Sequence, residues 1–465
     1  MFEKDFDNKI FELIKKYQLA KEQGTLSFID ENDFEQIFIY YFNNLDYDNA
    51  LEVVNDGIEI HKYSSVFYNQ KAEIFKELGK YHEALEILFQ ADAFSPNEMA
   101  IILNKVDIYS ILENYDVAIN LLKKVIDNSQ GIEKAELYLE LADVYEDAEN
   151  YKKVIWALTE CLQIDNQNEE ALNRIWFSVE LTEDYEFSIK FHKTLIDLNP
   201  YNYLAWNNLG HAYRGYKKHN EAIDAFEFVM AINETYESAY IDCADVYFNI
   251  EKYNKAIDLY TEVLDFTSRK KEIFFSIGKC YEELKNYTKA RDFYRESLSI
   301  DPYFAKAFYH VGRTYLVSNS PKSALKQLEK AYKLDDKNIE FQLALADAYL
   351  LLNEYDKSLE IYKKIIDSNE TNKQIHLNLI TILFESGDVL GALQYIDSII
   401  DKFKDVSDLL YIQVAFLYDI DRIEDAKAKL YEALEYNPKM SHLLIELLPY
   451  IAEDKEIMKI IDKYK

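Results

Sequence analysis

The sequence contains few of the residues that interrupt helices. Glycine occurs 10 times and proline 6 times among 465 residues, whereas average usage is about 7% glycine and about 5% proline. A chain so poor in these two residues is expected to be nearly all helix, with short connections between the helices.

The chain also lacks the usual features of secretion, membrane insertion and zinc binding. Its three cysteines, Cys161, Cys243 and Cys280, have no paired spacing, so we expect neither a disulfide nor a zinc site, and a reducing compartment fits. The first residues hold no apolar segment of the kind found in a signal peptide. No run of about 18 apolar residues occurs, so no membrane insertion is predicted. A cytoplasmic location is the expectation.

Sequence motifs for catalysis are missing as well. The glycines never form the phosphate-binding patterns G-x-G-x-x-G or G-x-x-x-x-G-K, and neither H-E-x-x-H nor C-x-x-C occurs. No pair of carboxylates can be singled out for acid–base chemistry. We therefore predict that the protein is not an enzyme and needs no cofactor.

Basic residues are also few relative to acidic ones. The chain has 52 Lys and Arg residues against 84 Asp and Glu residues, which gives a net charge of −32. Binding to nucleic acid requires a basic surface, and we expect no nucleic-acid partner. An acidic surface is either simply solvated or favours partners with basic segments.

What the sequence does contain is a regular repeat. A small residue, usually alanine, recurs every 34 residues, with one interval of 36. It is found at Ala50, Ala84, Ala118, Val154, Ser188, Ala222, Ala256, Ala290, Ala324, Ser358, Ala392 and Ala426. Around each one, apolar residues follow helical spacing in two segments. A period of this length is typical of helix-turn-helix units that stack into a solenoid.

Placing the small residue at position 20 divides the chain into twelve frames of 34 residues. The frames begin at Glu31, Ser65, Met99, Ala135, Glu169, Tyr203, Glu237, Lys271, Ala305, Ile339, Lys373 and Ser407. Most frames have a small residue at position 8 and tyrosines at positions 11 and 17. The sixth frame shows the pattern best, with Trp206, Leu209, Gly210, Tyr213, Ala222 and Phe226.

This pattern resembles the tetratricopeptide repeat over about residues 31–440. The resemblance implies an all-α fold, a right-handed α-solenoid of about twelve repeats with capping helices at both ends. We expect the two helices of a repeat to approach each other most closely where positions 8 and 20 meet. Frame five has Trp176 at position 8, and it should therefore pack more loosely or with a shifted crossing angle. The Asn-, Lys-, Ile- and Tyr-rich composition is typical of an AT-rich bacterial genome.

We expect four segments along the chain. Residues 1–30 form an N-terminal capping helix and linker, 31–134 the first three repeats, 135–440 repeats four to twelve, and 441–465 one or two C-terminal capping helices. The division after residue 134 follows from the single interval of 36, whose two extra residues fall between Asp127 and Glu133. We expect them to lengthen the turn there, either as a harmless surface loop or as a joint.

Polar residues that could contact a peptide follow from the resemblance, because the first helix of each tetratricopeptide repeat lines a concave groove. Asparagine can bind a peptide backbone through its paired donor and acceptor, and arginine can hold a carboxylate with two hydrogen bonds. The candidate peptide-binding residues are Asn173, Arg174, Asn207, Asn208, His211 and Arg214 in one stretch and Lys279, Lys306, Tyr309, His310 and Arg313 in another. The alternative is that these are ordinary polar residues without a ligand.

A third stretch of the predicted groove is acidic. It consists of Asp107, Glu140, Asp143, Glu146 and Asp147. The last four form a dense row together with Glu136, and their spacing places several carboxylates on one face of a helix. Such a row is typical of a solvated or partner-binding face, and although hard cations also bind clustered oxygens, we predict no metal site.

One frame is basic instead. The frame 305–338 carries Lys322, Lys326, Lys330 and Lys333 at helical spacing. This ridge is either a solvated face or a docking patch for an acidic partner or for the acidic face of another copy, so self-association stays open.

Together these observations predict a non-enzymatic scaffold that binds peptide or protein segments in its concave groove. The alternative is a regulatory or sensor module that controls a separate enzyme or transcription factor. The two differ in whether the partner's activity changes on binding, or only its location.

Overall fold

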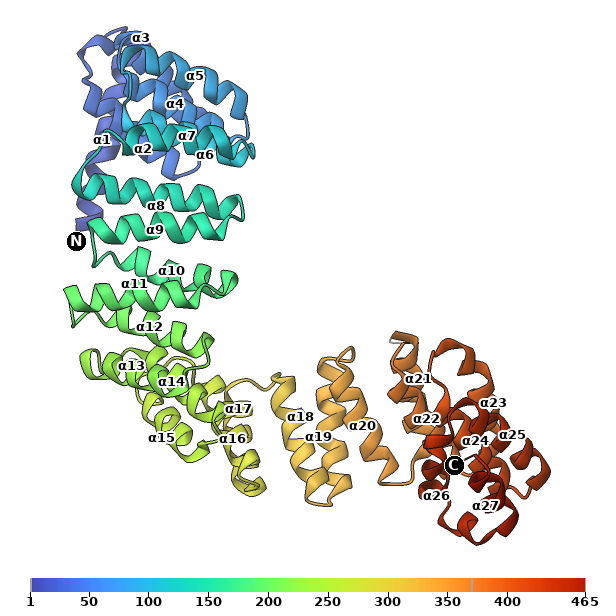
Figure 1. The fold of residues 1–465 in the computed structure, drawn as a ribbon. Coiled ribbons are helices and arrows are strands. Elements are labelled where there is room, and N and C mark those ends of the chain that lie inside the picture. The colour runs from blue at the N-terminus through green and yellow to red at the C-terminus, as the bar shows by residue number, and fades with distance from the viewer. Residues whose placement is uncertain (1, 369–370, 465) are drawn as a thin grey trace. The chain divides into compact units, whose positions relative to one another are not determined.

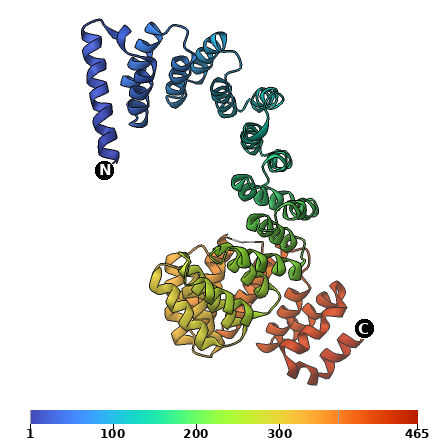
Figure 2. The same cartoon turned by 90° about the vertical axis from the view of Figure 1, so that its left-hand side faces the viewer.

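The computed structural model describes residues 2–368 and 371–464, and this part of the chain is helical, without β-strands. Residues 1 and 465, the outer ends of the two predicted caps, lie outside the described residues. Twelve helical hairpins follow one another along the chain (Figures 1 and 2), and within each of the two compact units described below, neighbouring hairpins pack on one another. The prediction of an all-α solenoid of helix-turn-helix units is confirmed.

Each hairpin consists of two antiparallel helices joined by a short turn. Their bounds are α2 Glu31–Asn43 and α3 Tyr47–Ile60, α4 Ser65–Glu77 and α5 Tyr81–Phe94, α6 Met99–Ile111 and α7 Tyr115–Ile126, α8 Gly131–Asp147 and α9 Tyr151–Ile164, α10 Glu169–Thr182 and α11 Tyr185–Leu198, α12 Tyr203–Gly215 and α13 His219–Ile232, α14 Glu237–Asn249 and α15 Tyr253–Val263, α16 Lys270–Glu283 and α17 Tyr287–Ile300, α18 Ala305–Val317 and α19 Pro321–Leu334, α20 Ile339–Leu350 and α21 Tyr355–Ser368, α22 Lys373–Glu385 and α23 Val389–Ile399, and α24 Ser407–Asp419 and α25 Ile423–Tyr436. The terminal helices are α1 Phe2–Glu22, α26 His442–Leu447 and α27 Lys455–Asp462.

The helices begin where the frames predict. The first helix starts at the first frame position in ten hairpins, and the second helix starts at position 17 in all twelve. The largest departure is α8, which begins four residues before Ala135. The segment 127–130 that precedes α8 is as long as the segment 95–98 that precedes α6. The two extra residues therefore extend a helix, and the expectation of a longer turn was wrong.

All twelve hairpin turns share a left-handed residue at frame position 15. Only Gly79 and Gly387 are glycines, and the others are Leu45, Glu113, Glu149, Glu183, Lys217, Glu251, Lys285, Asn319, Asn353 and Asp421. The next amide usually donates to the carbonyl at position 11, as Asn114 does to Tyr109 at 2.8 Å. This bond satisfies a carbonyl that the helix end leaves open, and it offsets part of the cost of left-handed backbone in a residue with a Cβ.

The small residue at position 8 faces a large side chain at position 24 of the same frame. A Cβ added to Gly210 would lie 2.6 Å from the Phe226 ring, and one added to Gly278 would lie 2.5 Å from the Tyr294 ring. The small residue at position 8 therefore makes room for a large buried side chain on the second helix. The expected close approach of positions 8 and 20 stays a prediction.

Frame five packs differently from the other frames, as expected from Trp176 at its position 8. Helix α10 lies mainly against α9 and α12 and makes little contact with α11, its own partner. The turn also lacks the usual bond, since among the described residues Asp184 donates no backbone hydrogen bond to Val179. The two helices of this hairpin thus pack more loosely than those of frames four and six, and the Trp176 ring lies against His211 of α12.

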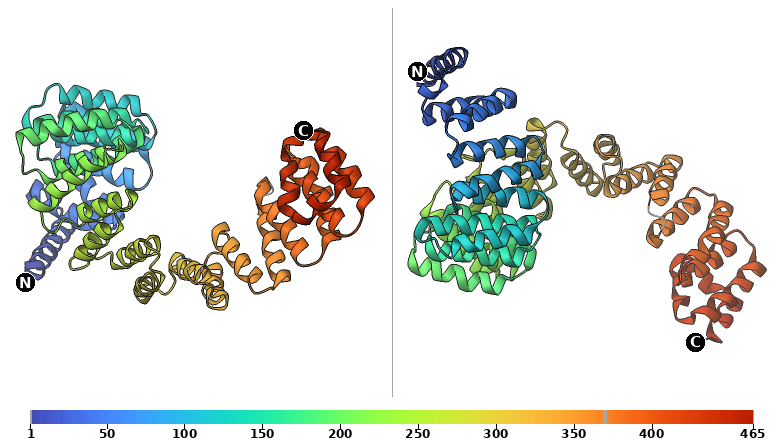
Figure 3. Two further views of the ribbon diagram at one scale, coloured as in Figure 1. Left: turned by 60° about the horizontal axis from the view of Figure 1, so that its bottom comes forward. Right: turned by 90° about the horizontal axis from the view of Figure 1, so that it is seen from above.

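Contacts within the chain divide it into two compact units, Met1–Ala239 and Tyr240–Lys465. In the first unit, α1 buries Ile10, Ile14 and Tyr17 against the first hairpin. In the second unit, the short helices α26 and α27 at the red end of the chain in Figure 3 bury their apolar residues against α24 and α25. The division predicted after residue 134 stays a prediction.

Candidate functional site

Arg174, a predicted peptide contact on α10, is already surrounded by carboxylates. Its guanidinium forms ion pairs with Asp143 and Glu146 on α8 and with Glu170 one turn earlier on α10, the last two at 3.0 Å. Its side chain is 23% exposed. An arginine held by three acidic side chains has little capacity left for a ligand carboxylate. In this structure it joins frame four to frame five.

The asparagines of the same stretch differ in their surroundings. Asn208 is buried, and its amide donates a 2.7 Å hydrogen bond to the carbonyl of Leu172 on α10. Asn207 is also buried, and its Oδ1 has no hydrogen-bond donor among the described residues. Asn173 is exposed. Asn208 therefore links two first helices, and only Asn173 offers a solvent-exposed amide.

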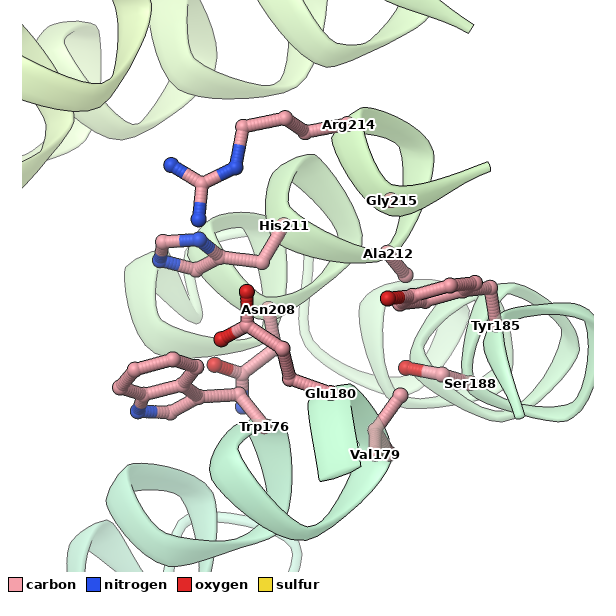
Figure 4. A pocket seen from close by; sticks show the side chains of 10 residues that line it. All are labelled: Trp176, Val179, Glu180, Tyr185, Ser188, Asn208, His211, Ala212, Arg214 and Gly215. Atoms are coloured by element: carbon pink, nitrogen blue, oxygen red, sulfur yellow. The ribbon is translucent and has the colours of Figure 1, made fainter. Parts of the chain in front are cut away.

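His211 and Arg214 border a small cleft between α10, α11 and α12 (Figure 4). The His211 ring stacks on Trp176, with 5.1 Å between ring centroids. Burial, and after it the charge of Arg214, lowers the pKa of His211 to about 3, so the imidazole is neutral at pH 7. The enclosed volume of about 20 Å³ has room for about one water molecule. The cleft occupies the space that Trp176 opens within frame five.

The second predicted stretch lies in the unit Tyr240–Lys465 and centres on Glu282 of α16. Glu282 accepts a 2.6 Å hydrogen bond from Tyr294 and lies 2.9 Å from Nδ1 of His310 and 3.6 Å from Arg313. Tyr309 packs edge-on against His310. Burial raises the pKa of Glu282, but the His310 and Tyr294 hydrogen bonds and the Arg313 charge outweigh burial, so the net pKa lies below its usual range. His310 and Arg313 thus interact with a carboxylate of the protein itself, that of Glu282.

The two lysines of this stretch lie apart from that cluster. The ammonium of Lys279 is 4.9 Å from the centroid of the Phe248 ring. Lys306 is exposed and forms no ion pair with a described residue. The basic ridge on α19 is exposed in the same way, and none of its four lysines is paired with a carboxylate in the described part of the chain.

Two residues of the acidic stretch, Glu140 and Asp143, line a groove between α6, α8 and α10. The groove has a volume of about 270 Å³ and is lined by Met99, Leu103, Glu133, Glu136, Leu137, Leu139, Glu140, Asp143 and Glu170. Of these carboxylates, Asp143 and Glu170 pair with Arg174, whereas Glu133, Glu136 and Glu140 pair with no described residue. The groove therefore combines an apolar floor with unneutralised negative charge.

The carboxylates that line the groove repel one another. Partial burial raises the pKa of Glu140, and the charges of Asp143, Asp107 and Glu170 raise it further. Partial burial also raises the pKa of Asp143, although Arg174 opposes that effect. A cation entering the groove would relieve this repulsion, because opposite charge favours the ionised carboxylate.

The structure brings together only part of the predicted acidic set. Glu140 and Asp143 line the groove, and Glu146 holds Arg174 nearby. Asp107 instead pairs with Lys76 at 2.8 Å, and Asp147 is exposed outside the groove lining. Glu136, which belongs to the acidic row expected from the sequence, also lines the groove, whereas nothing in the sequence pointed to Glu133, Glu170 or the apolar residues of the lining. Position within a repeat does not show which layers share a groove.

The described residues contain neither a candidate metal site nor a candidate membrane-spanning helix. No group of three His, Cys, Asp or Glu side chains is placed to hold a metal ion. Within residues 2–368 and 371–464, none of the helices combines the length and the apolar character that crossing a bilayer requires.

Stacked hairpins with a 34-residue period define a helix-hairpin repeat solenoid, a class whose extended surfaces act as protein-interaction scaffolds. Tetratricopeptide repeat models match residues 66–98 and 318–369, and the model of anaphase-promoting complex, cyclosome, subunit 3 matches residues 215–297. The chain is a tetratricopeptide repeat protein. The predicted bacterial origin stays a prediction.

Other proteins resemble parts of the chain. Human protein O-mannosyl-transferase TMTC1 is 23% identical over 168 residues, which make up 35% of this chain and 18% of that protein. The APC/C hetero-tetramer Cut9-Hcn1 matches 96% of this chain and 94% of its own, with 15% identity and a TM-score of 0.39. YrrB, described as a TPR protein with an unusual peptide-binding site, matches 40% of this chain and 95% of its own, with 19% identity and a TM-score of 0.34.

Proposed function

We propose that this protein is a non-enzymatic cytoplasmic scaffold that binds a basic segment of a partner protein in the acidic groove between α6, α8 and α10. The observation that carries the proposal is the groove itself, in which Glu133, Glu136 and Glu140 surround an apolar floor without a cation of their own. The repeat fold supports a role in binding, since solenoids present extended surfaces to their partners.

The chemistry of the groove fits lysine or arginine side chains in an extended segment. Their aliphatic stems can pack on Met99 and Leu103 while the charged ends reach the carboxylates. Arg174 illustrates this mode, because its guanidinium already lies among Asp143, Glu146 and Glu170 at one end of the groove. A net charge of −32 also favours encounter with basic partners.

The groove is a better candidate binding site than either of the two predicted polar stretches. Arg174 and Arg313 are paired with carboxylates, and Asn208 is bonded to a backbone carbonyl. A segment that needed these groups would first have to break internal interactions. A basic segment in the acidic groove would instead satisfy carboxylates that have no partner.

A fluorescein-labelled peptide of alternating lysine and leucine tests the proposal by fluorescence anisotropy. The double variant E136Q/E140Q removes two unpaired groove carboxylates and leaves the residues around Arg174 in place. We expect its Kd to rise about tenfold, since each exposed ion pair contributes up to about 1 kcal/mol.

The matched control is E83Q/E86Q on α5, which removes the same charge from exposed positions outside the groove. We expect it to bind nearly as tightly as the unmodified protein. Equal weakening in both variants would show that only net charge attracts the peptide, and unchanged binding in E136Q/E140Q would place the site elsewhere.

A further inference from the structure

A second hollow lies within the unit Met1–Ala239, between α11, α12 and α13. It has a volume of about 340 Å³ and is lined by Lys193, Ile196, Asp197, Trp206, Leu209, Tyr213, Glu221, Asp224 and Ala225. It involves the second helices of frames five and six and shares no residue with the acidic groove. It is therefore a separate site.

Two aromatic rings form walls of this hollow, and both are held in place. Trp206 donates a 2.9 Å hydrogen bond from Nε1 to the carbonyl of Pro200, and its ring stacks on Phe228 with 4.4 Å between centroids. Tyr213 follows Trp206 by seven residues on α12, so the two lie on the same helix face, and it is only 8% exposed. A ligand would meet aromatic surfaces that are already ordered.

The remaining lining separates into an apolar part and a charged part. Ile196, Leu209 and Ala225 are buried. Asp197 and Asp224 are exposed, as is Glu221, and none of the three carboxylates has a hydrogen bond or ion pair within the described chain. The single lysine in the lining, Lys193, holds its ammonium 5.7 Å from the Tyr213 centroid.

From these contacts we infer that the hollow binds the guanidinium of an arginine on a partner protein. A cation over an indole or phenol ring is attracted by the negative face of the ring. Glu221 and Asp224 are three residues apart on α13 and can both face such a cation. The planar guanidinium also stacks on a ring while donating to carboxylates, which the compact ammonium of lysine cannot do.

This site would let the scaffold hold a partner at two places on the same unit. The lining has apolar, aromatic and carboxylate parts, and each matches one part of an arginine side chain. The three methylenes match the apolar residues, the guanidinium plane matches the Trp206 ring, and its N–H groups match the exposed carboxylates. The inference does not depend on the acidic groove.

The indole N–H signals of the three tryptophans provide the test in the full chain. Protein labelled with ¹⁵N-tryptophan is titrated with the peptide acetyl-Gly-Ser-Gly-Arg-Gly-Ser-Gly-amide, and the W206F variant assigns the Trp206 signal. We expect the arginine peptide to shift the Trp206 signal in a saturable way while Trp156 stays in place. Peptides with lysine or citrulline in place of arginine should bind about tenfold more weakly.

Variants distinguish this site from the groove. E221Q/D224N should reduce the affinity for the arginine peptide, measured at the Trp206 signal, about tenfold. If that variant folds poorly, raising the salt concentration with the unmodified protein tests the same charges, and it should also weaken binding about tenfold. E136Q/E140Q should leave the Trp206 titration unchanged. An unmoved Trp206 signal, or equal shifts with the citrulline peptide, would overturn the inference whatever the groove binds.

Discussion

Tyr294 on α17 donates a 2.6 Å hydrogen bond to Oε2 of Glu282 on α16. The phenol ring is fully buried against Gly278, and its hydroxyl reaches the acid from inside the hairpin. Tyr260 makes the same kind of bond to Asp245 one frame earlier. Position 24 therefore contributes a core ring and also holds a carboxylate of the first helix.

Replacing Tyr294 with phenylalanine should lower the free energy of unfolding by about 1.5–3 kcal/mol, the usual contribution of a hydrogen bond to a charged group. Denaturant unfolding of the full chain, with hydrogen exchange on α16 and α17, measures the loss. Tyr287→Phe on the same helix is the control, because the Tyr287 hydroxyl makes no hydrogen bond in the described structure. Equal effects of the two variants would contradict the prediction.

The pKa of Glu282 lies below its ordinary value of 4.5 in the folded protein. Its ionised form is therefore favoured by folding, and this stabilisation is present above pH 4.5 and is lost as the pH falls through the lower, folded-state pKa. The difference in unfolding free energy between the unmodified protein and E282Q should be larger at pH 7 than at pH 3.5. A constant difference across this range would contradict the assignment.

The groove carboxylates should behave in the opposite sense. Burial and the charges of neighbouring carboxylates raise the pKa values of Glu140 and Asp143. Their mutual repulsion opposes folding when they are ionised. Protonation at low pH therefore stabilises the folded protein, and this stabilisation is lost as the pH rises through the folded-state pKa values. Glu140→Gln should stabilise α8 at pH 7 by about 0.2–0.5 kcal/mol for each repulsive pair relieved. Hydrogen exchange of α8 at pH 7 and pH 4 checks this, with E83Q as the control.

Gly210 should not tolerate a side chain while Phe226 occupies position 24. A Cβ would meet the ring at 2.6 Å, and overpacking of this kind costs about 1–3 kcal/mol. G210A is therefore expected to lower the melting temperature. Frame four combines Ala142 with Leu158 at the same two positions, so the double variant G210A/F226L should recover part of the loss, and its failure to do so would contradict the proposed contact.

Replacing a left-handed turn residue with glycine should stabilise the folded protein. Glu113 has φ +59° in the turn between α6 and α7, a conformation that costs an L-residue about 1–2 kcal/mol. Glycine removes that cost but loses about 0.4–1 kcal/mol through the freedom it gains in the unfolded chain. E113G should therefore gain up to about 1 kcal/mol over E113Q, which removes the same charge without changing the backbone preference. Equal stability of the two would contradict the prediction.

The sequence by itself determined the repeat, and with it the starts of nearly all the paired helices. Periodicity is a local property, because each pair of helices buries its apolar face on its neighbours in the same way. The wide separation of α10 from α11 also followed from the sequence, since Trp176 cannot occupy the position that Gly210 occupies in the next frame.

Only the tertiary structure decided which polar residues remain available to a partner. Frame position placed Arg174 and Glu140 on the same surface, yet Arg174 forms ion pairs with carboxylates from two helices whereas Glu140 forms no ion pair with a described residue. Met99 and Glu170 line one groove although they lie two frames apart in the sequence. Such contacts depend on how successive layers pack, and that geometry arises from many side chains together and not from a position within a single repeat.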